Sequence, residues 1–330
     1  MAQAFRQRAH EPALRPPVAA MRQAMTFYRF LAVHEPAVMQ QQLLDLGQSC
    51  GVRGTILIAQ EGVNGTLVGS TEDLKTMREG LEHHCGEMPF KYSDIDDENG
   101  GFYRFKVKLK NEIVTFGVPD LDVADNGEHV DAERWNELLA DPDVLVIDTR
   151  NQYEIDIGTF PGSVTPETEN FRDFPAWVAS ELDPEAQPRI AMFCTGGIRC
   201  EKASAFMKKQ GFAEVYQLDG GILKYLEEVP EETNRWSGEC FVFDQRVSVD
   251  RQLQQGQYQQ CYACRHPVSE ADMQHPAYEE GVSCPHCIAD LEGADRERFR
   301  ERQRQVELAQ QRGQQHIGSA QKAAPKAEGS

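Results

Sequence analysis

Two short apolar runs, LVID at residues 145–148 and IAMFC at residues 190–194, constrain the fold more than any other feature of the sequence. Strands that are buried on both faces have this uninterrupted apolar character, which is typical of parallel sheets covered by helices. The surrounding pattern alternates, with strands predicted over 144–149, 189–194 and 214–218 and helices predicted over 131–140 and 198–210. Such alternation predicts a doubly wound parallel sheet with helices on both faces.

The N-terminal part of the chain has a different pattern. A strand is predicted in MTFYRFLAV, a helix over 36–50, and two strands in TILIAQEGVNGTLVG about a turn at Asn64-Gly65, a dipeptide that favours hairpins. Ser70 with Asp73 is expected to cap a second helix that ends near His84. Further strands are predicted at FKYSDI and along FYRFKVKLKNEIVTFG (102–117). The order β-α-β-β-α-β predicts a ferredoxin-like domain.

Composition sets the domain organisation and the cellular context. The chain has 330 residues, 26% of them charged and 40% hydrophobic, which is typical of a soluble protein with two to three domains. We predict a loose leader (1–20), a ferredoxin-like α+β domain (21–120), a parallel-sheet domain (125–235), a cysteine-rich segment (236–293) and a charged helix with a disordered tail (294–330). No apolar run is long enough to cross a membrane, and the absence of a signal-peptide pattern predicts a cytoplasmic protein.

The stretch FCTGGIR places a cysteine where a buried strand meets a helix. Gly196 and Gly197 let the backbone curl, so that several N–H groups can face one anion at the positive end of the helix. Arg199 can add a positive charge, and both effects lower the pKa of a thiol below its usual value of about 8.5. We therefore predict Cys194 and Arg199 as catalytic residues, with Gly196 and Gly197 binding substrate. The alternative is a buried core cysteine before an ordinary turn.

Four cations follow one another at every second position, at Arg104, Lys106, Lys108 and Lys110. On a strand this spacing puts all four on one face. The net charge of −19 argues against a general nucleic-acid coat protein but leaves room for a local basic patch. RNA phosphates would relieve the repulsion among the four cations. A solvated sheet face is the alternative.

Two C-x2-C pairs, CYAC and CPHC, are separated by nineteen residues. Their thiols belong to Cys261, Cys264, Cys284 and Cys287, and the spacing is typical of a structural zinc site. Four thiolates complete a tetrahedron and leave no open position for chemistry. His266 and His286 are possible alternative ligands, and two pairs of reduced thiols without metal are the other interpretation.

Several motifs resemble the rhodanese domain family. They are DTRNQYE, which contains Asp148, Arg150 and Glu154, then GTFPGS (158–163), CTGGIR (194–199) and LDGG (218–221), in the family's order. The resemblance covers about residues 125–235 and implies a rhodanese fold with Cys194 as the catalytic cysteine. The loop of six residues has the size found in sulfurtransferases, whereas related phosphatases use one residue more.

The whole chain, over roughly residues 24–290, resembles one family more specifically. The N-terminal motifs, the rhodanese core, WSGECFVFDQRV (236–247) and the four cysteines together are similar to the bacterial rhodanese-type tRNA uridine hydroxylase (TrhO) family. The resemblance implies oxygen-dependent 5-hydroxylation of the wobble uridine, position 34, and assigns tRNA to the basic strand. Molecular oxygen is then a co-substrate, and the electron donor stays unknown.

Two other functions stay open at this point. Cys194 could carry a persulfide as a sulfurtransferase acting on RNA or a small acceptor. The rhodanese and cysteine-rich modules could instead form a non-catalytic adaptor. Neither a membrane nor a stable protein partner is inferred from the sequence.

Overall fold

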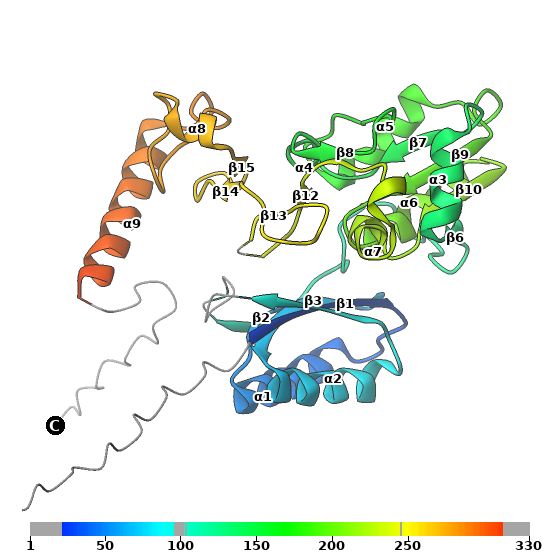
Figure 1. The fold of residues 1–330 in the computed structure, drawn as a ribbon. Helices are drawn as coiled ribbons and strands as arrows, with labels where there is room; N and C mark the ends of the chain where they lie inside the picture. The colour runs from blue at the N-terminus through cyan, green and yellow to red at the C-terminus, as the bar shows by residue number, and fades with distance from the viewer. Residues whose placement is uncertain (1–21, 96–101, 103, 245, 313–330) are drawn as a thin grey trace, which may run out of the picture.

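The computed structural model describes residues 22–95, 102, 104–244 and 246–312. The leader predicted over 1–20, the tail beyond 312, and Tyr103 lie outside the described residues. Figure 1 shows an N-terminal α+β domain below a parallel-sheet domain, which we call the rhodanese domain after the family that its motifs resemble, with the C-terminal segments beside them. No helix in these described ranges is long and apolar enough to cross a membrane.

The N-terminal domain is a five-stranded sheet with two helices on one face. Its elements are β1 (Arg22–Phe30), α1 (Pro36–Cys50), β2 (Arg53–Ala59), β3 (Gly62–Ser70), α2 (Thr71–Cys85), β4 (Phe90–Ile95) and β5 (Phe105–Leu109). The strand order is β4-β1-β3-β2-β5, with β2 and β5 parallel and the other pairs antiparallel. Leu43 of α1 and Leu74 of α2 pack on the sheet, which leaves the opposite face uncovered by these helices (Figure 1). The ferredoxin-like prediction is confirmed.

The predicted hairpin turn at Asn64-Gly65 is wrong. Ala59 pairs with Gly62, so the chain turns at residues 60–61, and Asn64 and Gly65 lie inside β3. A Cβ on Gly65 would come within 2.7 Å of the Phe27 ring and 2.9 Å of a backbone oxygen, so this glycine serves close packing. Tertiary contacts therefore override the local hairpin signal at this dipeptide.

The long strand predicted over 102–117 is also wrong beyond its first half. β5 ends at Leu109. After it, two carboxylates accept the backbone hydrogen bonds that a neighbouring strand would otherwise accept. Glu61 Oε1 accepts the N–H of Ile113 at 2.6 Å, and Glu112 Oε2 accepts the N–H of Phe116 at 3.0 Å. The segment leaves the sheet because these side chains satisfy its backbone donors, and Phe116 enters a core of the next domain.

The rhodanese domain contains a four-stranded parallel sheet in the order β6-β10-β9-β7. Its elements are β6 (Glu128–Val130), α3 (Ala132–Ala140), β7 (Leu145–Asp148), α4 (Gln152–Ile155), β8 (Gly158–Thr159), α5 (Phe174–Glu181), β9 (Arg189–Phe193), α6 (Ile198–Lys209), β10 (Glu214–Leu218) and α7 (Gly221–Glu228), with short 3-10 turns at Phe171–Asp173 and Glu231–Thr233. Helices cover both faces: α3 and α7 enclose one core and α5 and α6 another. The doubly wound prediction is confirmed.

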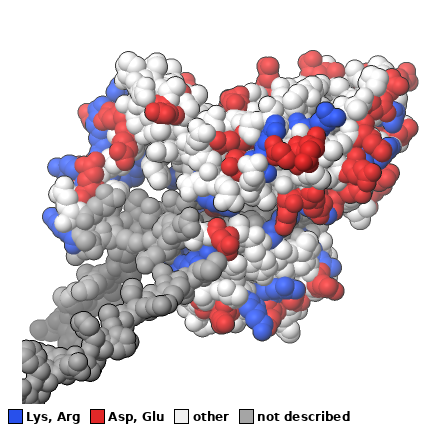
Figure 2. All heavy atoms as spheres, in the orientation of Figure 1, with Lys and Arg blue, Asp and Glu red and all other residues white. Residues whose placement is uncertain are grey.

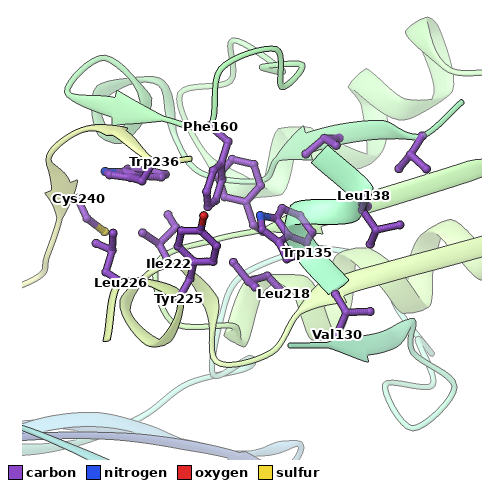
Figure 3. Close-up of a cluster of buried hydrophobic side chains, with 14 of the residues drawn as sticks. Val130, Trp135, Leu138, Phe160, Leu218, Ile222, Tyr225, Leu226, Trp236 and Cys240 are labelled. Carbon is purple, nitrogen blue, oxygen red and sulfur yellow. The ribbon is translucent and has the colours of Figure 1, made fainter. Parts of the chain in front are cut away.

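The first residues after the last helix of the rhodanese domain still pack on that domain. Trp236 packs edge-to-face on Phe160, with ring centroids 5.0 Å apart, and covers the Arg150 guanidinium at 5.1 Å. Figure 3 shows Trp236 and Cys240 against the same cluster as Tyr225 and Ile222. The segment that begins at Trp236 is therefore anchored in the rhodanese core.

The remaining C-terminal elements are small. They are β11 (Ser237–Gly238), β12 (Cys240–Phe241), β13 (Ser248–Val249), β14 (Gln259–Gln260), β15 (Pro267–Val268), α8 (Glu270–Gln274) and α9 (Gly293–Gln311). β11 pairs with β8 of the rhodanese domain, and β14 pairs with β15. The Arg302 side chain of α9 donates to the backbone oxygens of Tyr262 and Gly281, and so ties the helix to the cysteine-rich unit.

Candidate active site at the Cys194 loop

Cys194 lies at the end of β9, at the start of a loop that leads directly into α6. The apolar sequence buries β9, and Gly197 takes a φ of +101° that a residue with a side chain adopts at a cost. This turn directs the Gly197 N–H at Cys194 Sγ, 3.1 Å away. The Gly196 position opens into free space. The loop thus has the nest geometry expected from its glycines.

The environment of Cys194 favours a thiolate. Burial opposes ionisation, but a hydrogen bond from the Cys200 thiol, the Arg199 charge and the backbone N–H groups of residues 199 and 200 outweigh it and lower the pKa of Cys194 to about 5. The neighbouring Cys200 is affected in the opposite sense, because burial and its hydrogen bond to Cys194 raise its pKa. The pair therefore has one ionised sulfur and one that stays protonated at neutral pH.

Arg199 does not stand as an unpaired charge. Its guanidinium binds the buried Glu154 carboxylate in a bidentate pair, with Nη1–Oε2 at 2.6 Å and Nη2–Oε1 at 2.7 Å. Burial would raise the pKa of Glu154, but the charges of Arg199 and Arg150 lower it. Arg199 therefore keeps its position next to the loop while Glu154 offsets most of its charge.

The residues after Arg199 reach the N-terminal domain. Glu201 accepts from the Tyr28 hydroxyl at 3.2 Å. Lys202, which is 3% exposed, binds Glu61 at 2.8 Å and Glu112 at 2.6 Å. The helix that starts at the cysteine loop is thus fixed to the other domain by two consecutive side chains.

A cavity of about 670 Å³ lies between the open face of the N-terminal sheet and the Cys194 loop. Cys194, Gly196 and Arg199 form one wall, and Tyr28 and Lys91 belong to the opposite wall. Phe243 and Arg246 of the C-terminal segment close a further side. Tyr28 and Lys91 are functional candidates that the sequence analysis missed, because alternation on a strand shows which residues face outward but not what they face.

The basic strand borders this cavity. The side chains of Arg104, Lys106, Lys108 and Lys110 are exposed, but only Lys106 and Lys108 lie within β5. Val107 between these two is buried, whereas Leu109 is 44% exposed, so the predicted alternation is present only around Val107. Lys106 pairs with Thr55 and Lys108 with Leu57 across the sheet, and both partners line the cavity. Because paired residues share a face, Lys106 and Lys108 lie at the edge of the face that forms the cavity wall, and Arg104 and Lys110 flank them in the sequence.

The four cysteines predicted as ligands come together in the C-terminal segment. The sulfur atoms of Cys261, Cys264, Cys284 and Cys287 all lie within 4.8 Å of one another. Cys284 Sγ lies 3.7 Å from the sulfur of Cys264 and 3.7 Å from that of Cys287. A tetrahedron of thiolates at about 2.3 Å from a metal ion has edges of about 3.8 Å, so this cluster could hold a metal ion.

The thiolate of Cys194 can be titrated directly. A folded-state pKa of about 5 means that the sulfur is ionised throughout the neutral range and becomes protonated only as the pH falls through 5. The difference in thiolate absorbance at about 240 nm between the protein and its Cys194→Ser variant should therefore have its midpoint near pH 5, against about 8.5 for an ordinary cysteine. Cys200→Ala should move the midpoint upward, because it removes a donor to the thiolate. A midpoint above pH 8 in the unaltered protein would contradict this description of the loop.

Comparisons with known proteins agree with this domain order. A family model described as the UPF0176 acylphosphatase-like domain matches residues 22–113, and the rhodanese-like domain model matches residues 131–228. Among solved structures, the rhodanese-like domain of an Anabaena protein has 19% identity, with 33% of this chain and 78% of that chain covered and a TM-score of 0.28. An acylphosphatase from Coxiella burnetii has 11% identity, with 27% and 92% covered and a TM-score of 0.20. The chain thus has an acylphosphatase-like N-terminal domain followed by a rhodanese domain, which is the signature architecture of the UPF0176/TrhO family.

Proposed function

We propose that the protein is a tRNA-modifying enzyme that hydroxylates C5 of the wobble uridine, position 34, with Cys194 as the reactive centre. One atom of molecular oxygen would enter the base, and an external two-electron donor would reduce the other atom to water. The observation that supports this most is the position of an activated thiol in a cavity bordered by a basic strand. Enzymes that act on a nucleobase need both a reactive group in a pocket and a surface for the phosphate backbone. The signature architecture of the UPF0176/TrhO family is the basis for choosing hydroxylation.

The basic strand supplies the RNA surface in this proposal. Arg104, Lys106, Lys108 and Lys110 would bind backbone phosphates, while Gly196 and Gly197 would present N–H groups at the reacting centre. Phosphate contacts position an RNA without reading its sequence, so the strand would orient tRNA over the cavity. The acidic character of the rest of the chain favours such a local mode of binding over a general one.

A persulfide function is the second candidate, and the burial of Cys194 favours it. The cysteine has no exposed surface, although it lines the cavity. An outer sulfur atom on Cys194 would extend further into the cavity, and the loop N–H groups suit a small anionic adduct. In that case the protein would transfer sulfur to an acceptor.

One experiment separates these functions. In a strain that lacks the gene, the Cys194→Ser protein should fold and bind tRNA but should restore no 5-hydroxyuridine, because a hydroxyl stays protonated where the thiol ionises. Mass spectrometry of tRNA nucleosides gives the readout, and Cys50→Ser, on α1 outside the cavity lining, is the matched control and should restore it fully. Thiosulfate turnover by the purified protein would instead identify a sulfurtransferase. Full restoration by Cys194→Ser would place the active site elsewhere or make the protein an adaptor.

We also propose that the four-cysteine cluster holds one structural zinc ion. Zinc is the ion that four thiolates at this spacing bind in most structural sites, and it would supply folding stability rather than chemistry. The surrounding segment buries few large apolar side chains, so the bound metal would supply the folding stability that a hydrophobic core supplies in larger domains.

Metal analysis of protein purified without chelator should find about one equivalent of zinc per chain. Cys284→Ser should lose the metal and lower the stability of the C-terminal segment, while the titration of Cys194 should stay unchanged. An equally stable protein without metal would contradict the assignment of zinc.

A further inference from the structure

Lys91 of the N-terminal domain reaches the rhodanese domain beside the cysteine loop. It lies on β4 opposite Thr26 of β1, and both residues line the cavity. Its Nζ donates to the backbone oxygen of Gly220 in the rhodanese domain. The next residue, Gly221, packs so tightly on the loop that a Cβ there would lie 2.5 Å from Cys194 O and 2.8 Å from Gly197 N. Lys91 is thus held beside the backbone that supports Cys194.

Most cations around the cavity are paired with carboxylates, but Lys91 and the exposed Arg172 form no such pair among the residues that the structure describes. Of these two, Lys91 is the one that is bonded beside the Cys194 loop. Arg199 is paired with Glu154, Lys202 with Glu61 and Glu112, and Arg246 with Asp244. Lys91 forms no ion pair with a carboxylate among the residues that the structure describes, and its bond to Gly220 uses one of three donors. Two donors remain for a ligand. Burial lowers the pKa of Lys91, whereas Cys194 and Asp219 favour its charged form.

The cavity itself suits one nucleotide. Its volume of about 670 Å³ lies in the range of small-molecule sites. Thr26, Thr55 and Asn64 offer hydrogen bonds from the sheet, and Phe243 on the cavity wall is 58% exposed, which leaves an aromatic face for stacking. A base inside an RNA stack could not enter such a site, so the reacting nucleotide must leave the stack.

The sheet gives the RNA a path into the cavity. The basic strand β5 and the Lys91 strand β4 are the two edges of the same five-stranded sheet. With strands about 4.8 Å apart, these edges are separated by about 19 Å, the span of a few nucleotides. A backbone held at β5 can therefore cross the open face of the sheet and meet Lys91 next to Cys194.

We propose that the cavity takes one nucleotide extruded from the RNA, and that Lys91 binds the phosphate of this nucleotide beside the Cys194 loop. This inference rests on the proposed function and adds to it the substrate form and the residue that positions it. Lys91 is available to bind the phosphate, whereas the Arg199 guanidinium is already paired with Glu154. The N-terminal domain is then part of the substrate site as well as an RNA surface.

A double-mutant cycle between protein and RNA tests this inference. The RNA is an anticodon stem-loop hairpin with uridine at position 34, either unmodified or with one neutral methylphosphonate beside that uridine. The neutral linkage should weaken binding to the unaltered protein by about tenfold, and Lys91→Met should weaken binding of the unmodified hairpin similarly, because each removes one partner of a desolvated charge pair. In the Lys91→Met protein the neutral linkage should then have no further effect.

The controls make each outcome decisive. Lys75→Met, on the exposed side of α2, changes the same charge away from the cavity and should retain the full effect of the neutral linkage. Methionine keeps the apolar stem of Lys91, and an unchanged thermal unfolding curve would show that folding is preserved. Additive effects of the two changes would overturn the role of Lys91, while the proposed function would stand if 5-hydroxyuridine is still formed. A hairpin that does not bind the unaltered protein would overturn both.

Discussion

Four consecutive side chains at the start of α6 connect the reactive loop with the rest of the molecule. Arg199 binds Glu154, and Cys200 lies beside Cys194; Glu201 and Lys202 then bind residues of the N-terminal domain. Lys202 is the most constrained of the four, because burial of its ammonium group destabilises the folded state by several kcal/mol unless carboxylates surround it. Glu61 and Glu112 meet this need, and the same two side chains hold the segment that links the domains. Domain placement and loop placement therefore depend on one cluster.

In this arrangement both domains contribute residues to the candidate active site. The rhodanese domain supplies the thiolate, and the N-terminal domain supplies Tyr28, Lys91 and the bordering cations. In Figure 2 acidic side chains gather over the rhodanese domain, and the net charge of the chain is −19. An anionic substrate would thus be repelled from much of the surface and attracted only where the cations lie, which favours one mode of approach.

The sequence predicted those parts of the fold in which local pattern and burial agree. The apolar runs before Asp148 and Cys194 identified the parallel sheet, and the glycines after Cys194 identified the loop. Prediction was wrong where distant groups decide the local structure, as at Gly65, whose neighbours are Phe27 and Thr55. It was also wrong after Leu109, where Glu61 and Glu112 replace a neighbouring strand. No sequence pattern pointed to Lys91, because the groups that it faces belong to the rhodanese domain.

The most direct test of this account is whether Lys202 holds the two domains around the cavity. Small-angle scattering should find a larger radius of gyration for Lys202→Met than for the unaltered protein, with both domains still folded, because two carboxylates then lack their cation. Lys209→Met, an exposed position on the same helix, should leave the radius unchanged, and Lys202→Arg should restore most of the compactness. An unchanged radius of gyration in Lys202→Met would contradict the claim that this cluster builds the site.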